Sequence, residues 1–139
     1  MQEAGNQLLK QGREIRRKLV IGQAVEKYSE GLAILHAALA APPALTTALY
    51  SNRAFAEGLL GNWRSSFESA RWALKTDPKH VKSYIRAAKA AQELRKWPAA
   101  LEVCAWGLAV EEAAPELLRM QAVRALLLSQ LPWGVAVDG

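Results

Sequence analysis

Apolar residues recur along the chain with the spacing of amphipathic helices, and one pattern of large and small side chains occurs twice, 34 positions apart. The window from Tyr50 to Leu74 aligns with the window from Tyr84 to Leu108. The matched pairs are Tyr50 with Tyr84, Ala54 with Ala88, Leu60 with Leu94, Trp63 with Trp97, Ser66 with Ala100, and Leu74 with Leu108. A period of this length, with small residues at fixed places, predicts stacked helix-turn-helix units.

A longer copy of the pattern precedes these two. Gly5 corresponds to Ala54, and Ala24 corresponds to Ser66. However, Gly5 and Ala24 are 19 positions apart, whereas Ala54 and Ser66 are only 12 positions apart. The first unit therefore holds about seven extra residues, which lie within 12–22. We interpret this segment as a lengthened helix or as a loop between two helices.

The periodicity and its breaks predict an all-α fold. Helices are expected over about 2–13, 22–39, 45–60, 63–75, 78–95, 97–112 and 117–131. The pair Pro42-Pro43 breaks the chain, Gly61 closes the helix before it, and Asp77 with Pro78 suits a helix start. We expect a single domain over 1–131 and a tail over 132–139, with repeats at about 2–40 (insertion near 12–22), 45–77 and 78–112, and a capping helix at about 115–131. Stacked repeats of this kind form a right-handed α-solenoid with a concave groove.

Composition narrows the class of partner. The net charge is +5, which favours an acidic partner without choosing between a peptide, nucleic acid and a membrane. The only cysteine, Cys104, excludes an internal disulfide and fits a reducing compartment. It aligns with Ala70, so we expect a buried packing residue. No apolar run is long enough to span a bilayer, and no signal peptide is apparent.

The first helix of each unit lines the groove of such a solenoid, so its periodicity selects the residues that face a ligand. The polar members of this set are mainly amides and cations, and Lys82 and Arg86 share one helix face because they are four residues apart. Cations opposite carboxamides form a good receptor for a carboxylate. The groove is therefore predicted to bind an acidic group.

The segments QEAGN, LYSNRA and HVKSYIRAA resemble the carboxylate-clamp tetratricopeptide repeat (TPR) domains. These domains bind the acidic C-terminal peptide of the seventy- and ninety-kilodalton heat-shock chaperones. The resemblance implies that Asn6 and Asn52 donate amides to the terminal carboxylate of the peptide. It also implies that Lys82 bridges that carboxylate or the side chain of the last Asp, and that Arg86 holds an acidic side chain further back. Further groove residues are Gln2, which stands where the family has a lysine, Lys10, Phe55 and Lys89.

These observations predict a protein–protein interaction module, a TPR co-chaperone adaptor, with no catalytic residues, cofactor or metal. The alternative is a TPR scaffold with a degenerate clamp and a different protein partner. A nucleic-acid ligand would depend on the basic cluster of Arg13, Arg16, Arg17 and Lys18, and neither nucleic acid nor a membrane is expected as a partner. His36 and His80 have no metal-ligand spacing. We expect a cytoplasmic location, to which the sequence leaves a nuclear one open as an addition, and the sequence also leaves the oligomeric state open.

Overall fold

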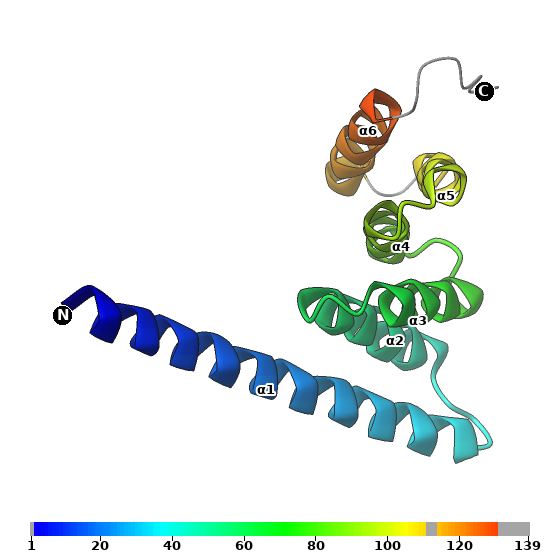
Figure 1. Cartoon of the computed structure of the whole chain (residues 1–139). Coiled ribbons are helices and arrows are strands. Elements are labelled where there is room, and N and C mark those ends of the chain that lie inside the picture. The colour runs from blue at the N-terminus through cyan, green and yellow to red at the C-terminus, as the bar shows by residue number, and fades with distance from the viewer. Residues whose placement is uncertain (1, 111–113, 131–139) are drawn as a thin grey trace.

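The computed structural model describes residues 2–110 and 114–130, and these residues form six helices and no strand (Figure 1). The helices are α1 (Gln2–Ala37), α2 (Pro43–Leu59), α3 (Trp63–Thr76), α4 (Val81–Glu93), α5 (Trp97–Leu108) and α6 (Ala114–Ser129). Helices α2 to α6 stack into one body (Figure 1). The all-α repeat fold expected from the sequence is confirmed for this body. No helix in the described ranges is both long and apolar enough to cross a membrane.

Small side chains let the paired helices approach closely. Ala54, Ala88 and Ala100 have no exposed surface, and Ser66 is almost completely buried. The Ser66 hydroxyl donates a hydrogen bond of 2.7 Å to the Ala54 carbonyl oxygen, which joins α3 to α2. The residues that the 34-residue repeat marks as small are therefore the residues at the helix crossings.

The far end of the stack is covered by α6. Leu127 of α6 is completely buried in the same core as Ala88 of α4 and Cys104 of α5. The capping role that the sequence predicted is confirmed, and so is the burial of Cys104. The predicted tail, 132–139, lies outside the described residues.

The turns that follow α2 and α4 share one backbone conformation. Gly61 has a φ of 79°, and Arg95, one repeat later, has a φ of 59°. Left-handed backbone after a helix is a common way to end it, and glycine adopts it without the steric cost that a Cβ atom brings. The repeat therefore requires the same turn twice and supplies glycine only once.

We expect Arg95→Gly to raise the free energy of unfolding by about 0.5–1 kcal/mol, because it removes the left-handed strain at an exposed site. Gly61→Ala should lower it by a similar amount, about 1 kcal/mol. Urea denaturation of both variants and the parent chain measures the two effects. A destabilised Arg95→Gly chain would contradict this explanation of the turn.

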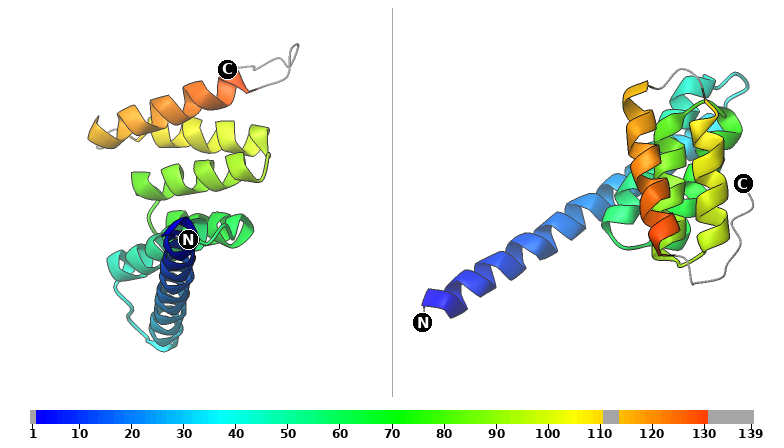
Figure 2. Two further views of the ribbon diagram at one scale, coloured as in Figure 1. Left: turned by 60° about the vertical axis from the view of Figure 1, so that its left-hand side comes forward. Right: turned by 90° about the horizontal axis from the view of Figure 1, so that it is seen from above.

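The first repeat is not a helix-turn-helix. We expected separate helices over about 2–13 and 22–39, and this expectation is wrong because α1 is one continuous helix of 36 residues. All of residues 2–20 are exposed, and the N-terminal half of α1 extends away from the body (Figure 1 and the right view of Figure 2). Of the two interpretations of the extra residues, the lengthened helix is the one that the structure shows.

The continuity of α1 has a local cause. The segment from Gly12 to Gly22 contains no proline, and most of its residues are good helix formers. Arg17 and Glu14 add an ion pair of 3.4 Å on the surface of the same helix. With nothing to stop it, the helix continues through the position where the later repeats turn.

A smaller correction concerns the start of α4. The sequence predicted a helix from about 78, but α4 begins at Val81. The Asp77 carboxylate accepts a hydrogen bond of 3.0 Å from the backbone N–H of Lys79, and the backbone N–H of His80 bonds to the Asp77 carbonyl oxygen. Asp77 therefore stabilises a turn, and His80 occupies the N-cap position.

Candidate ligand-binding groove

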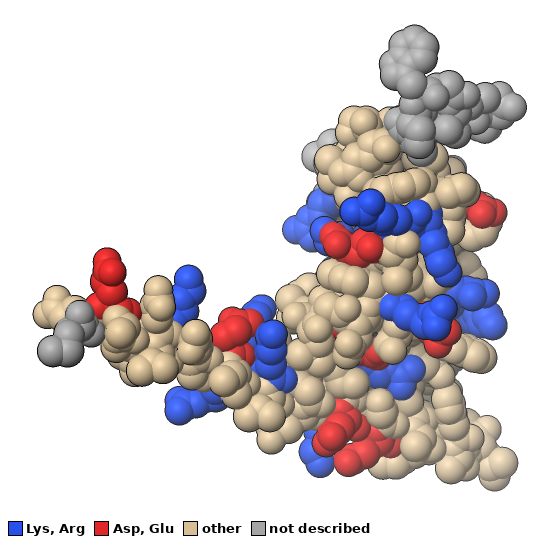
Figure 3. Space-filling model, in the orientation of Figure 1, with Lys and Arg blue, Asp and Glu red and all other residues tan. Residues whose placement is uncertain are grey.

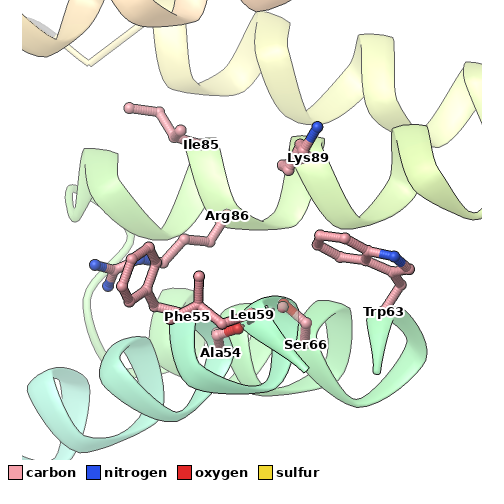
Figure 4. Close-up of a pocket in the computed structure, with 9 residues that line it drawn as sticks. Ala54, Phe55, Leu59, Trp63, Ser66, Ile85, Arg86 and Lys89 are labelled. Atoms are coloured by element: carbon pink, nitrogen blue, oxygen red, sulfur yellow. Dashed lines mark hydrogen bonds between the residues drawn. The ribbon is translucent and has the colours of Figure 1, made fainter. Parts of the chain in front are cut away.

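A mostly apolar pocket of about 240 Å³ lies between α2 and α4. It is the hollow that the two repeats leave where their first helices pass each other (Figure 4). The lining residues are Ala54, Phe55, Gly58, Leu59, Trp63, Ser66, Ile85, Arg86 and Lys89. Trp63, at the start of α3, forms one wall, and a Cβ atom at Gly58 would approach its ring to 3.1 Å. The pocket is large enough for an apolar side chain and has cations at its edge.

Arg86 extends from α4 to α2. Its guanidinium Nη1 donates a hydrogen bond to the Ser51 hydroxyl, and its carbon Cζ lies 5.1 Å from the centre of the Phe55 ring (Figure 4). A guanidinium over an aromatic face is an attractive arrangement. Phe55, which was predicted as a groove residue, therefore also positions this cation.

Buried hydroxyl groups continue the contact between the two repeats. Ser83 donates a hydrogen bond of 3.1 Å to Ser51, and both side chains are buried. The His80 ring Nδ1 lies 2.7 Å from the Ser83 hydroxyl oxygen. These linked hydrogen bonds were not evident from the sequence, because single serines at buried positions leave no periodic signal.

Three of the predicted clamp residues lie on the facing helices α2 and α4. Asn52 on α2 and Lys82 on α4 are exposed, and Lys82 is one helical turn before Arg86. Lys89 is also exposed and forms an ion pair of 2.9 Å with Glu93. On the face of the body in Figure 3, acidic side chains are interspersed among the basic ones. The positive character of the groove is therefore local to α4.

The remaining predicted residues are elsewhere. Gln2, Asn6 and Lys10 lie on the exposed N-terminal half of α1, and none of them lines the pocket between α2 and α4. The structure of one chain thus does not bring Asn6 next to Asn52. The reason is the continuous α1, which carries the first helix of the repeat away from the body.

The basic cluster is also on this projecting half. Arg13, Arg16, Arg17 and Lys18 are all exposed.

In the part of the chain that is described, no three His, Cys, Asp or Glu side chains are grouped so that they could hold a metal ion.

A second polar network, absent from the sequence analysis, joins α1, α2 and α3. Arg53 lies 3.4 Å from the Glu57 carboxylate, and Ser69 donates a hydrogen bond of 3.0 Å to that carboxylate. Arg53 also donates to Ser69 and Ser29, and its guanidinium lies over the Tyr50 ring. Glu57 is 7% exposed, so these partners replace the water that would otherwise bind its side chain. The network joins α2 to α1 and α3 through side-chain hydrogen bonds.

The chain is similar to known proteins over most of its length. No family model matches it. It is 38% identical over 100 residues to Tetratricopeptide repeat protein 4 of Bos taurus, and 36% identical over 94 residues to the Hsp70/Hsp90 co-chaperone CNS1 of Saccharomyces cerevisiae. These matches cover 72% and 68% of this chain. The chain is therefore related to the tetratricopeptide repeat co-chaperones.

Solved structures agree with this relationship. The Hsp90 co-chaperone Cns1 from Saccharomyces cerevisiae superposes with a TM-score of 0.67 at 30% identity, over 86% of this chain and 38% of that chain. The TPR2B domain of yeast Sti1, in complex with an Hsp70 peptide, gives a TM-score of 0.70 at 24% identity, over 86% of this chain and 92% of that one. The Sti1 match is evidence for the fold. The chain spans about a quarter of the length of the curated relatives it matches, 25% of the bovine protein and 23% of the yeast protein.

Proposed function

We propose that this chain is a co-chaperone adaptor domain that binds the acidic C-terminal peptide of a heat-shock chaperone of the seventy- or ninety-kilodalton class. The observation that carries the proposal is the pairing of Lys82 and Arg86 on α4 with Asn52 on α2, beside an apolar pocket. The names of the relatives support the same partner class.

The roles of these residues follow from their chemistry. The Asn52 amide and the Lys82 ammonium are exposed donors for a terminal carboxylate. Arg86 is already oriented by Ser51 and Phe55, so it loses little freedom when it binds an acidic side chain of the peptide. The pocket lined by Leu59, Trp63 and Phe55 suits an apolar side chain between the acidic groups.

A labelled peptide that ends in Glu-Glu-Val-Asp with a free carboxylate is expected to bind with a Kd of about 1–10 µM. The same peptide with a C-terminal amide should bind at least about tenfold more weakly, because a charge-assisted hydrogen bond contributes about 1.5–3 kcal/mol. Lys82→Ala and Arg86→Ala should each cause a similar loss. Fluorescence polarisation measures all four affinities.

Lys75→Ala is the matched control, because it removes an exposed cation of α3 that lies over Trp72, away from the groove. It should leave the affinity unchanged, and circular dichroism should show that every variant is folded. Equal binding of the acid and amide peptides would reject the carboxylate role. A folded chain that binds neither peptide would favour the alternative, a TPR scaffold for a different protein.

A further inference from the structure

One face of α2 exposes apolar side chains where the next repeat exposes charged ones. Leu45 is 46% exposed, Phe55 is 53% exposed and Leu59 is 40% exposed, and Ala48 lies on the same face. The equivalent residues, 34 positions later, are Lys79, Lys82, Lys89 and Glu93. An exposed apolar stripe of this kind is typical of a surface that another helix covers, so we look for a helix that would cover this face of α2.

The sequence identifies the covering helix as the start of α1. Alignment of Gly5 with Ala54 places Asn6 at the position of Phe55 and Leu9 at the position of Gly58. On α2, these positions face α4 across the pocket. The same surface of residues 5–10 would therefore pack against α2 as α2 packs against α4. Leu8 is 69% exposed and Leu9 is 61% exposed. Both the start of α1 and the facing surface of α2 therefore expose apolar side chains in the single chain.

In a single chain, the continuous helix keeps these two surfaces apart. Ile21 is the first residue of α1 that is partly buried. Asn6 precedes it by 15 residues, which corresponds to roughly 22 Å along a helix axis. Figure 1 and the right view of Figure 2 show that this half of α1 leaves the body. With α1 intact, only a second chain can place residues 5–10 against α2.

We propose that two copies of this chain exchange the N-terminal halves of their α1 helices, so that residues 2–13 of each copy cover α2 of the other. Such an exchange is closed and two-fold symmetric, and every interface forms twice. It buries Leu9 of one copy against Phe55 of the other. It also brings Asn6 of the second copy next to Asn52, which completes the set of amides and cations; this last point rests on the proposed function.

The oligomeric state of the full chain is the first test. Light scattering after size exclusion is expected to give the mass of two chains. Leu9→Asp and Phe55→Asp, which place a charge in the exchanged interface, should each give the mass of one chain. Ile34→Asp is the matched control, because Ile34 is a 70% exposed residue of α1 outside that interface. A one-chain mass for the parent, or a dimer that survives both interface variants, would overturn the proposal.

A disulfide between chains tests the geometry directly. A Leu9→Cys chain mixed with a Phe55→Cys chain should form a covalent heterodimer under mild oxidation. Neither variant by itself should form a covalent dimer. The native Cys104 does not compete, because its burial raises the pKa of the thiol to about 11 and leaves almost no reactive thiolate. If α1 instead bends back onto its own body, residues 9 and 55 meet only within one chain and no covalent heterodimer forms.

Complementation then separates this proposal from the proposed function. Asn6→Ala and Lys82→Ala chains, each defective alone, should recover peptide binding when they are unfolded and refolded together. Random pairing would restore about a quarter of the grooves, those that receive Asn6 from one chain and keep Lys82 of the other. A parent chain that is a cross-linkable dimer but binds no peptide would reject only the proposed function. Peptide binding by a parent dimer without recovery in the mixture would reject the exchange.

Discussion

An Ala54→Leu chain is expected to lose about 3 kcal/mol of its free energy of unfolding, a large part of the stability of a domain of this size. Ala54 has no exposed surface, and its carbonyl oxygen accepts the Ser66 hydroxyl across the α2–α3 crossing. Three added carbon atoms must separate the two helices or force strained rotamers, since neither neighbour can move without breaking another contact. Urea denaturation followed by circular dichroism measures the loss.

Ala105→Leu is the matched control for this substitution. Ala105 lies in the last turn of α5 and is exposed, so the same three carbon atoms enter solvent. Its effect should stay within about 0.5 kcal/mol of zero. A loss at Ala54 no greater than the loss at Ala105 would show that the small residues of the repeat do not set the helix spacing.

The second and third repeats could be predicted because small residues carry unusual information. An alanine that must be small recurs at the same place in each unit, as Ala54 and Ala88 do, whereas large apolar residues can exchange with one another. The turn residues were less uniform. Gly61 predicted its turn, because glycine favours a positive φ. Arg95 forms the same turn with a positive φ that arginine rarely adopts.

The first repeat could not be predicted in full because the spacing of its small residues and its local helix propensity indicate different structures. The positions of Gly5 and Ala24 indicate a pair of helices, while the residues between Gly12 and Gly22 favour one helix locally. The longer spacing between the small residues marked the place of the conflict without deciding it. In the structure of one chain the local helix propensity prevails. An exchange between two chains would be consistent with both the local propensity and the repeat pattern.

The groove was predictable only where charge and periodicity coincide. Lys82 and Arg86 were identified because they are four residues apart and so share one face of the predicted helix. What orients Arg86 was not evident, because Ser51 and Phe55 belong to the preceding repeat. In the same way, Arg53 and Glu57 have the spacing of an ordinary surface pair, and only the packing of α1 and α3 around them makes the pair buried.

Glu57→Ala is expected to lower the free energy of unfolding by about 3 kcal/mol, because it leaves the Arg53 guanidinium without its counter-charge in a mostly buried site. The side chain of Arg53 is 22% exposed and that of Glu57 is 9% exposed. Ser69 also loses the acceptor of its hydrogen bond. Thermal or urea denaturation measures the loss, and the remaining bonds from Arg53 to Ser29 and Ser69 keep it near the lower end of the range for buried pairs.

Glu93→Ala provides the control for burial, because Lys89 and Glu93 form an ion pair with the same spacing at 53% and 37% side-chain exposure. Removing it should change stability by less than about 0.5 kcal/mol. The double variant Arg53→Met with Glu57→Leu separates the two causes of the Glu57 effect. If the cost comes from an uncompensated charge, the double variant should recover most of the lost stability, since apolar side chains of similar volume often replace a buried pair at little cost. If the double variant is as unstable as Glu57→Ala, the network contributes through its hydrogen bonds between helices instead of through charge balance.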